Sequence, residues 1–319
     1  MSIGNIHLGL CCINMTLSAK KPRVFVNRTC RLQTAIDKGL DYLHSLTVQN
    51  LQDCSKLLDW NKEHGIRSYR LSSNMFPHLS NPSFYEYDYS LNFARPYLYE
   101  IGAKAYEYNQ RLSMHPGQYN QIGAVSEEVF NKTVLDLRCH ADILDIIEED
   151  LDFDENKGII CIHGGGVYGD KKKTMERWCQ NFHRLPKNVQ ERIAIENCEK
   201  CYTVDDCLKI SEILNIPVIF DIHHYNCYEL LHPKEKQVSL EEVLKKVFKT
   251  WERRGLKPYC HISEQGSGKV GHHSDYISEL PDCFLNADRE FTLDVEAKMK
   301  EKAIMRLVEL YKTETLYES

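Results

Sequence analysis

The sequence has 319 residues, 42% of them hydrophobic and 27% charged, and a formal net charge of -6. A chain of this length can bury a sizeable core, and it suits one large α/β domain or two smaller ones. We find no apolar run of about 18 residues and no basic segment followed by an apolar block at the N-terminus. The sequence therefore predicts neither a transmembrane helix nor a secretory signal. The 13 scattered cysteines favour reduced thiols in an intracellular compartment, cytoplasm or nucleus, over a disulfide framework.

Strand-like and helix-like stretches alternate along the chain. Apolar or alternating runs predict strands at 6–12, 66–73, 112–115, 158–163, 193–197, 217–224, 258–263 and 291–296. Amphipathic stretches predict helices at 32–46, 48–63, 91–112 apart from its end, 171–182, 203–214, 239–254 and 297–311, and a further helix that begins after Ser126. Ser126, Thr203 and Ser239 are expected helix N-caps, and Val238 with Val243 is expected to form a hydrophobic staple.

This order of elements predicts the fold. Eight strands, nearly all followed by a helix, with no linker between halves, predict a single (β/α)8 TIM barrel over residues 1–319. Several strands are continuous apolar runs, which is typical of parallel strands buried on both faces. A doubly wound open sheet is the alternative, but it would more often carry a glycine-rich phosphate loop after the first strand, and the sequence has none there.

Ligand-type side chains stand at the ends of strands three to eight. They are His115, His163, Glu196, Asp221, His224, His261 and Glu296, with His273 in the loop after strand seven. Any one of these histidines is more often structural than a ligand, but in a barrel all these strand ends meet at one face. Mixed imidazoles and carboxylates suit Mn²⁺, Zn²⁺ or Fe²⁺ better than Ca²⁺ or Mg²⁺ alone. We therefore expect two or three ions about 3.5–4 Å apart, an arrangement typical of phosphoester hydrolysis. His223 flanks His224 and is expected on the other face of its strand.

Several motifs carry a family resemblance. The most specific is Ser113-Met-His-Pro-Gly-Gln-Tyr119, and Arg70-Leu-Ser-Ser73, Asp221-Ile-His-His224 and Val295-Glu-Ala-Lys298 accompany it. Together they resemble the UV damage endonucleases, DNA-repair barrels related to the apurinic endonuclease IV group, from about residue 6 to residue 312. The resemblance implies an endonuclease that uses divalent metal ions, Mn²⁺ in most members with Zn²⁺ or Mg²⁺ as alternatives. It implies a monomer that nicks damaged double-stranded DNA just 5′ of cyclobutane dimers, 6-4 photoproducts or abasic sites, leaving a 3′-hydroxyl and a 5′-phosphate.

The resemblance also implies roles for individual residues. By matching positions, the eight side chains at the strand ends would be metal ligands, with His115, Glu196 and Glu296 as catalytic residues. Gln118 and Tyr119 match a probe pair that enters the duplex beside the lesion, where an aromatic ring and an amide can replace lost stacking and pairing.

Three further residues are candidates for DNA contact. Asn14 matches a position near the lesion in the family, although an asparagine that stabilises a turn is an equal alternative. Independently of the resemblance, Lys171 and Lys269 could contact DNA phosphates, although exposed lysines are more often plain solvated surface. The net negative charge does not exclude such binding, because bound cations can invert the local field.

The sequence departs from the family at three positions. Well-known members carry a modified, metal-binding lysine where Tyr259 stands here, so the number of ions is open. Lys257, two residues earlier, is expected to lie too far from the rim to replace it. Leu10 and Asn74 replace an aromatic residue and a histidine of some relatives, which leaves the lesion preference open.

Other interpretations remain open at this point. Cys198 and Cys201 form a lone CxxC motif, and we interpret these cysteines as incidental because no second pair is present. The competing functions are an abasic-site endonuclease without photoproduct activity, a two-metal sugar isomerase with the same barrel, and a catalytically inactive protein that binds DNA lesions.

Overall fold

Eight parallel strands close into a barrel in the computed structural model, which describes residues 2–85, 89–234 and 239–317, with side chains as far as residue 312. The strands are β2 Ile6–Cys11, β3 Ser68–Leu71, β4 Arg111–Met114, β5 Ile159–His163, β6 Ile193–Glu196, β7 Val218–Asp221, β8 Tyr259–Ile262 and β9 Phe291–Val295. Each strand pairs in parallel with the next, and β2 pairs with β9 to close the ring. The predicted (β/α)8 barrel is therefore confirmed, with β1 (Ser2–Ile3) as a short antiparallel addition to β2.

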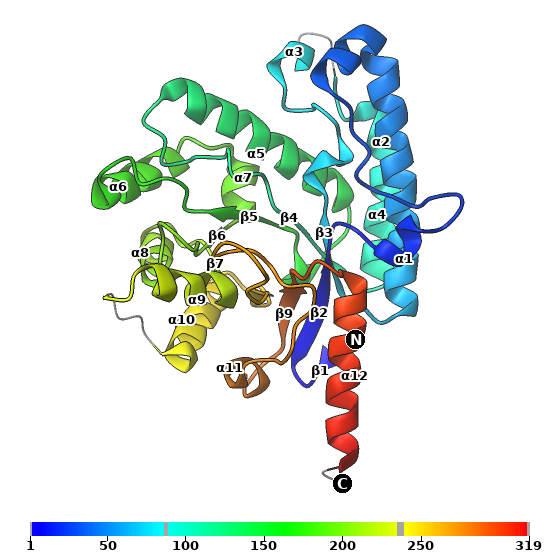
Figure 1. Cartoon of the computed structure of the whole chain (residues 1–319). Helices are drawn as coiled ribbons and strands as arrows, with labels where there is room; N and C mark the ends of the chain where they lie inside the picture. Colours follow the sequence, from blue (N-terminus) through cyan, green and yellow to red (C-terminus); the bar gives the residue numbers. More distant parts are fainter. Residues whose placement is uncertain (1, 86–88, 235–238, 318–319) are drawn as a thin grey trace.

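Helices surround this barrel (Figure 1). The longer ones are α2 Leu32–Glu63, α4 Arg95–Glu107, α5 Glu127–Ile147, α6 Lys171–Phe182, α8 Val204–Leu214, α9 Ile222–Leu231, α10 Leu240–Glu252 and α12 Glu301–Tyr317. The short ones are α1 Met15–Ser18, α3 Pro82–Tyr85, α7 Lys187–Arg192 and α11 Asp282–Leu285, with 3-10 turns at Ser73–Met75, Asn92–Ala94 and Asp154–Asn156. None of the helices described has the length and apolar character that crossing a bilayer requires. All 13 cysteines are free thiols.

The three predicted N-caps are confirmed. The Ser126 side chain accepts a hydrogen bond from the backbone N–H of Val129 at the start of α5, and Ser239 does the same for Glu242 at the start of α10. Thr203 and Asp206 form a reciprocal capping box at α8. Val238 lies outside the described residues, so the hydrophobic staple stays a prediction.

Three predicted boundaries are wrong. Residues 32–46 and 48–63 belong to one helix, α2, and its break falls at Gly39, where the backbone has φ 74°. The strand predicted at 217–224 ends at Asp221, because the Asp221 side chain accepts the backbone N–H of His224 and so begins helix α9 at Ile222. Helix α12 also begins at Glu301, four residues after its predicted start.

The interior of the barrel contains many buried polar and charged side chains. Buried Arg70, His261 and Asp294 point into it from β3, β8 and β9. Space for this layer comes from Gly9, since a Cβ there would lie 1.9 Å from a carboxylate oxygen of Asp294. The barrel therefore carries charged groups directly beneath the ends of its strands, where the candidate site begins.

Candidate metal centre

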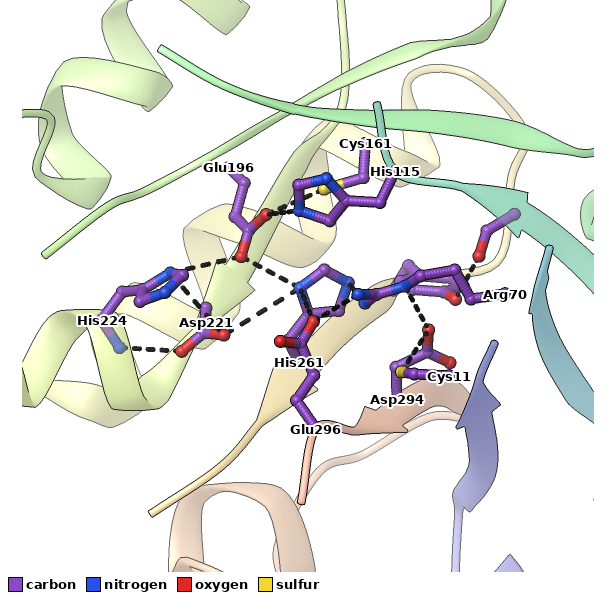
Figure 2. A network of polar contacts seen from close by, with 12 residues as sticks. Cys11, Arg70, His115, Cys161, Glu196, Asp221, His224, His261, Asp294 and Glu296 are labelled. Carbon is purple, nitrogen blue, oxygen red and sulfur yellow. Dashed lines mark hydrogen bonds and ion pairs between the residues drawn. The ribbon is translucent and has the colours of Figure 1, made fainter. Parts of the chain in front are cut away.

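The barrel brings seven of the eight predicted ligands into one cluster at the carboxyl ends of its strands, and Figure 2 labels all of them except His163. The members are His115, His163, Glu196, Asp221, His224, His261 and Glu296. They arrive from β4 through β9, over 180 residues of sequence, because parallel strands all end at the same face. Four overlapping groups of three side chains have ligand atoms within 4.8 Å of one another. Each group therefore has ligand atoms close enough together to hold a cation.

Glu196 is the hub of the cluster. Its carboxylate is fully buried, and one oxygen accepts hydrogen bonds from Nε2 of His115 at 3.0 Å and lies 3.2 Å from Nε2 of His163. The other oxygen lies 3.0 Å from Nδ1 of His261 and 3.3 Å from Nδ1 of His224. A single buried carboxylate thus faces four imidazoles, two on each oxygen.

The charges of the cluster depend on one another. Burial alone would raise the pKa of Glu196, but the imidazoles of His261 and His163 outweigh it and hold that pKa well below its usual range. Burial lowers the pKa of His163, yet the Glu196 carboxylate and hydrogen bonds to Cys198 and Glu196 raise it to about 10. Burial also lowers the pKa of His224, but Asp221 and Glu196 outweigh it and raise that pKa well above its usual value. At His115 burial prevails and the pKa is lowered.

Arg70 is a residue of this centre that the sequence analysis did not select. Its Nη1 lies 2.6 Å from Glu296, its Nε lies 3.2 Å from Asp294, and its Nη2 donates to Nε2 of His261 at 2.8 Å. Since a guanidinium only donates, Nε2 of His261 is the acceptor, and Nδ1 of that ring carries the hydrogen that faces Glu196. Burial opposes the charge of Arg70, but the acids around it keep its pKa well above normal. Arg70 is therefore a fixed cation at the edge of the cluster.

Cys161 is a second residue that was missed. Its sulfur donates to Glu196 at 2.9 Å from the same face of β5 that carries His163. The signal was available, because residues two apart on a strand share a face.

The donor set fits divalent cations. Oδ2 of Asp221 is buried and has no hydrogen-bond partner in the described part of the chain. It lies 3.7 Å from Nδ1 of His224 and 4.0 Å from Nδ1 of His261. A buried carboxylate oxygen without a donor is costly unless a cation or water satisfies it. Imidazole and carboxylate ligands together suit Mn²⁺, Zn²⁺ or Fe²⁺.

His273 and His223 lie beside the cluster. Nδ1 of His273 donates to the backbone carbonyl of Glu296 at 2.6 Å and lies 3.9 Å from that residue's carboxylate, so His273 sits at the rim. His223 is on helix α9 and not on a strand, so the predicted reason for its orientation is wrong. Its ring is 5.4 Å from that of His273 and in contact with the sulfur of Cys227.

The family departures have clear structural consequences. Tyr259 lies in the barrel below the cluster, where its hydroxyl is 2.8 Å from that of Ser113, and burial raises its pKa. Lys257 points to the opposite end of the barrel and pairs with Glu155 at 2.9 Å. Leu10 is fully buried in the hydrophobic core, whereas Asn74 is exposed beside the site. A lysine ligand of the family type is therefore missing from both places that the sequence considered.

The predicted probe residues lie on the loop that follows β4. Gln118 and Tyr119 are both exposed, and 83% of the Tyr119 surface is accessible. A hollow of about 880 Å³ extends from His115 past Tyr119 to Asn74, between the loops after β3 and β4 and helix α5. An aromatic ring with so little packing is in a position to contact a large partner.

The remaining candidates occupy separate places. Asn14 caps α1 by accepting the N–H of Leu17 at 2.8 Å, as the alternative interpretation held, while its Nδ2 is buried without a partner among the residues described. Lys171 is paired with Asp206 at 2.6 Å at the start of α6, and Lys269 is exposed in the loop after β8.

The CxxC motif has a local structural role. Cys198 is buried, and its sulfur accepts the backbone N–H groups of Cys201 and Tyr202, each at 3.3 Å. This turn links the end of β6 to α8. Neither cysteine belongs to a metal-binding group found among the described residues.

Comparison with known proteins agrees with this geometry. The model of the UV-endonuclease UvdE family matches residues 6–318. A relative from Acanthamoeba polyphaga mimivirus is 37% identical over 308 residues, which cover 95% of this chain and 90% of that protein. The UV-damage endonuclease of Schizosaccharomyces pombe is 36% identical over 311 residues, which cover 96% of this chain and 50% of the yeast protein, so the chain spans about half of that relative.

Two of the solved structures that match this chain differ in how far the likeness extends. The crystal structure of SacUVDE matches with a TM-score of 0.83 and 30% identity, over 97% of this chain and 99% of that one. A D-allulose 3-epimerase from Methylomonas sp. matches with a TM-score of 0.51 and 14% identity, over 92% of this chain and 85% of that one, and this likeness shows a shared barrel alone. The chain therefore belongs to the UV-endonuclease UvdE family and is a UV-damage endonuclease, a DNA-cleaving enzyme of DNA repair.

Proposed function

We propose that this chain uses divalent cations to nick the damaged strand of a DNA duplex immediately 5′ of a UV photoproduct, leaving a 3′-hydroxyl and a 5′-phosphate. Cyclobutane dimers and 6-4 photoproducts are the main substrates in this proposal, with abasic sites as a further class. The observation that carries it is the buried carboxylate of Glu196, shared by four imidazoles at the mouth of the barrel.

The centre would hold two or three ions, with Mn²⁺ first and Zn²⁺ or Mg²⁺ as alternatives. The ligands would be His115, His163, Glu196, Asp221, His224, His261, His273 and Glu296. Bound cations would lower the pKa of a coordinated water and stabilise the attacking and leaving oxygens of the phosphodiester.

The acids at the centre would orient the reaction. Glu196 lies between two groups of imidazoles, so it would help to hold cations at the centre, and Glu296 is paired with Arg70. Arg70 would keep the Glu296 carboxylate ionised, because its charge lowers the pKa of that group despite the effect of burial. His115 connects the centre to the loop that carries the probe residues, and its loss should remove one ligand.

Substrate recognition would come from the exposed loop and the hollow beside it. Tyr119 could replace the stacking that a flipped nucleotide vacates, and Gln118 could pair with exposed base edges. A photoproduct weakens the stack, so opening the duplex costs less there than in undamaged DNA. Asn14, Lys171 and Lys269 are further proposed DNA contacts. Asn14 also caps a helix, and Lys171 also pairs with a carboxylate.

The proposal is tested by nicking of supercoiled plasmid with Mn²⁺. We expect relaxation of UV-irradiated plasmid, little relaxation of untreated plasmid, and none with a chelator or with His115→Ala. Treatment of the irradiated plasmid with photolyase and light should remove the part of the nicking that depends on cyclobutane dimers. An oligonucleotide with one dimer and a 5′ label then maps the cut, and extension by a polymerase detects the 3′-hydroxyl.

The same assay separates the alternatives. Nicking of abasic plasmid without nicking of irradiated plasmid would identify an abasic-site endonuclease. Binding of irradiated DNA without nicking would identify an inactive lesion binder. A sugar isomerase would neither bind nor cut DNA, and it would interconvert keto-sugars in the presence of the metal.

A further inference from the structure

The loop of residues 116–121, which we call the probe loop, has three exposed residues, Gly117 to Tyr119, followed by two anchored ones. Gln118 and Tyr119 point outward, whereas Asn120 is buried directly after them. Nδ2 of Asn120 donates to the carbonyl of Gly117 at 3.0 Å, which closes the loop on itself. The same nitrogen donates to Oδ2 of Asp136 on helix α5 at 2.8 Å. The exposed pair is therefore displayed by a residue that is itself fixed to a helix.

Gln121 provides a second anchor on the other flank. Its backbone N–H donates to the hydroxyl of Thr133 on α5 at 2.9 Å. Its side-chain nitrogen donates to the carbonyl of Gln118 at 2.9 Å, and its side-chain oxygen accepts the N–H of Gly166 at 2.8 Å. The same oxygen also accepts from the hydroxyl of Tyr168 at 3.4 Å, so the probe loop is tied to α5 at two points and to the loop after β5 at two.

Asp136 joins the probe loop to the rest of the hollow. While one oxygen accepts from Asn120, the other accepts from the hydroxyl of Ser80, in the loop after β3, at 2.6 Å. One turn later on α5, His140 lies 3.0 Å from the hydroxyl of Ser73, which donates to the carbonyl of His115 at 3.1 Å. Helix α5 therefore holds both the probe loop and the backbone of a predicted metal ligand.

We propose that Asp136 is a positioning residue for lesion recognition, which acts through Asn120 on Tyr119. This inference rests on the proposed function. The Tyr119 ring has little packing of its own. A protein binds DNA more tightly when the backbone that carries such a ring is already ordered, because no free energy is then lost in ordering it on binding. Asp136 has the geometry for this, since it is the only residue described that links the probe loop, the loop after β3 and helix α5 through one carboxylate.

The test uses a duplex with one cyclobutane dimer and 2-aminopurine opposite it, whose fluorescence rises when the base unstacks. Asp136→Ala should weaken binding of this duplex about tenfold, the size expected when one or two loop side chains must be ordered at binding. It should also reduce the fluorescence rise, with Mn²⁺ content and binding of undamaged duplex unchanged. Asp136→Asn should bind the damaged duplex, and raise its fluorescence, almost as the wild type does. The asparagine oxygen can still accept from Asn120, and its NH₂ group can donate to the Ser80 hydroxyl.

Two further variants identify the route of the effect. Asp142→Ala, on the same helix but bonded to Asn188, is the matched control and should bind damaged duplex as the wild type does. If Asp136 acts through Tyr119, Asp136→Ala should cost little in a Tyr119→Ala background. Full additivity of the two changes, or an Asp136→Ala protein equal to the wild type, overturns the inference.

The outcomes keep the inference apart from the proposed function. If the wild-type protein does not prefer damaged DNA, the proposed function fails before the variants are compared. If the wild type nicks and prefers damaged DNA while Asp136→Ala does the same, the inference alone fails. Circular dichroism melts confirm folding, and if Asp136→Ala does not fold, Asn120→Ala removes the same link from the loop side and carries the same expected tenfold loss.

Discussion

Replacing Glu196 by glutamine tests the centre most directly. The side chain is fully buried and belongs to three of the four candidate groups of metal ligands, so one substitution removes a shared carboxylate from all three. Glutamine keeps the size of the side chain but presents an NH₂ group to imidazoles that need an acceptor. We expect Mn²⁺ content to fall to near zero and nicking to be lost.

The effect on stability can be estimated from the length of the chain. An ion present at 100 times its dissociation constant stabilises the folded state by about 2.7 kcal/mol. For 319 residues, the entropy of unfolding is roughly 0.67 kcal/mol per kelvin, so one ion raises Tm by about 4 °C and two raise it by about 8 °C. Glu196→Gln should show a rise of less than about 1 °C under the same conditions.

The assay is a thermal melt with and without Mn²⁺, combined with metal analysis of the dialysed protein. The control is Glu155→Gln, which makes the same chemical change next to Lys257 at the other end of the barrel and should keep the full Mn²⁺-dependent rise. A Glu196→Gln protein that retains both the bound metal and the Tm rise would refute the view that this carboxylate is a shared ligand.

Three further predictions concern other parts of the molecule. Tyr119→Ala should leave Tm and Mn²⁺ content unchanged, because the side chain is 83% exposed, and should weaken binding of UV-damaged duplex by about tenfold or more in fluorescence anisotropy. Tyr259→Phe should cost about 1–2 kcal/mol in urea unfolding, since it removes the hydrogen bond to Ser113, yet keep the full metal content; a loss of metal would show that the phenol is a ligand. Asp53 holds the loop before α2 through Arg28, and although burial raises its pKa, its hydrogen bonds lower that pKa overall. The stability that the Asp53 carboxylate contributes should be fully present above its unfolded pKa of about 3.9 and should be lost as pH falls through its lower folded pKa. In urea unfolding, Asp53→Asn should therefore be less stable than the wild type at pH 7 and equal to it in acid. A difference in stability that stays constant with pH would contradict this.

The barrel and most of the cluster could be predicted from two simple patterns in the sequence. A buried parallel strand is recognisable as a short apolar run, and its last inward-facing residue lies at the common face. His163 and Glu196 each end such a run, so their proximity could be predicted although they are far apart in sequence. What they do when they meet, such as the sharing of one carboxylate among four rings, depends on side-chain geometry that no local pattern contains.

The end of β7 was harder to predict for a physical reason. The apolar run Val218–Phe220 continues into Ile222, so strand and helix periodicities cannot be told apart there. Asp221 decides the boundary by capping the backbone of His224, which turns the chain into α9. Arg70 was missed for another reason. Its inward direction follows from its strand, but a charge inside a barrel is acceptable only with partners, and Asp294 and Glu296 are more than 220 residues away in sequence.

The electrostatics of Glu196 have a consequence for how cations would bind at this centre. Burial lowers the pKa of His163 and of His224, but neighbouring carboxylates outweigh it and raise both pKa values, which favours the protonated rings, and a nitrogen that binds a cation must first release its proton. Loading is thus an exchange of protons for metal, and apparent affinity should rise steeply with alkalinity. Acid should therefore weaken cation binding at this centre.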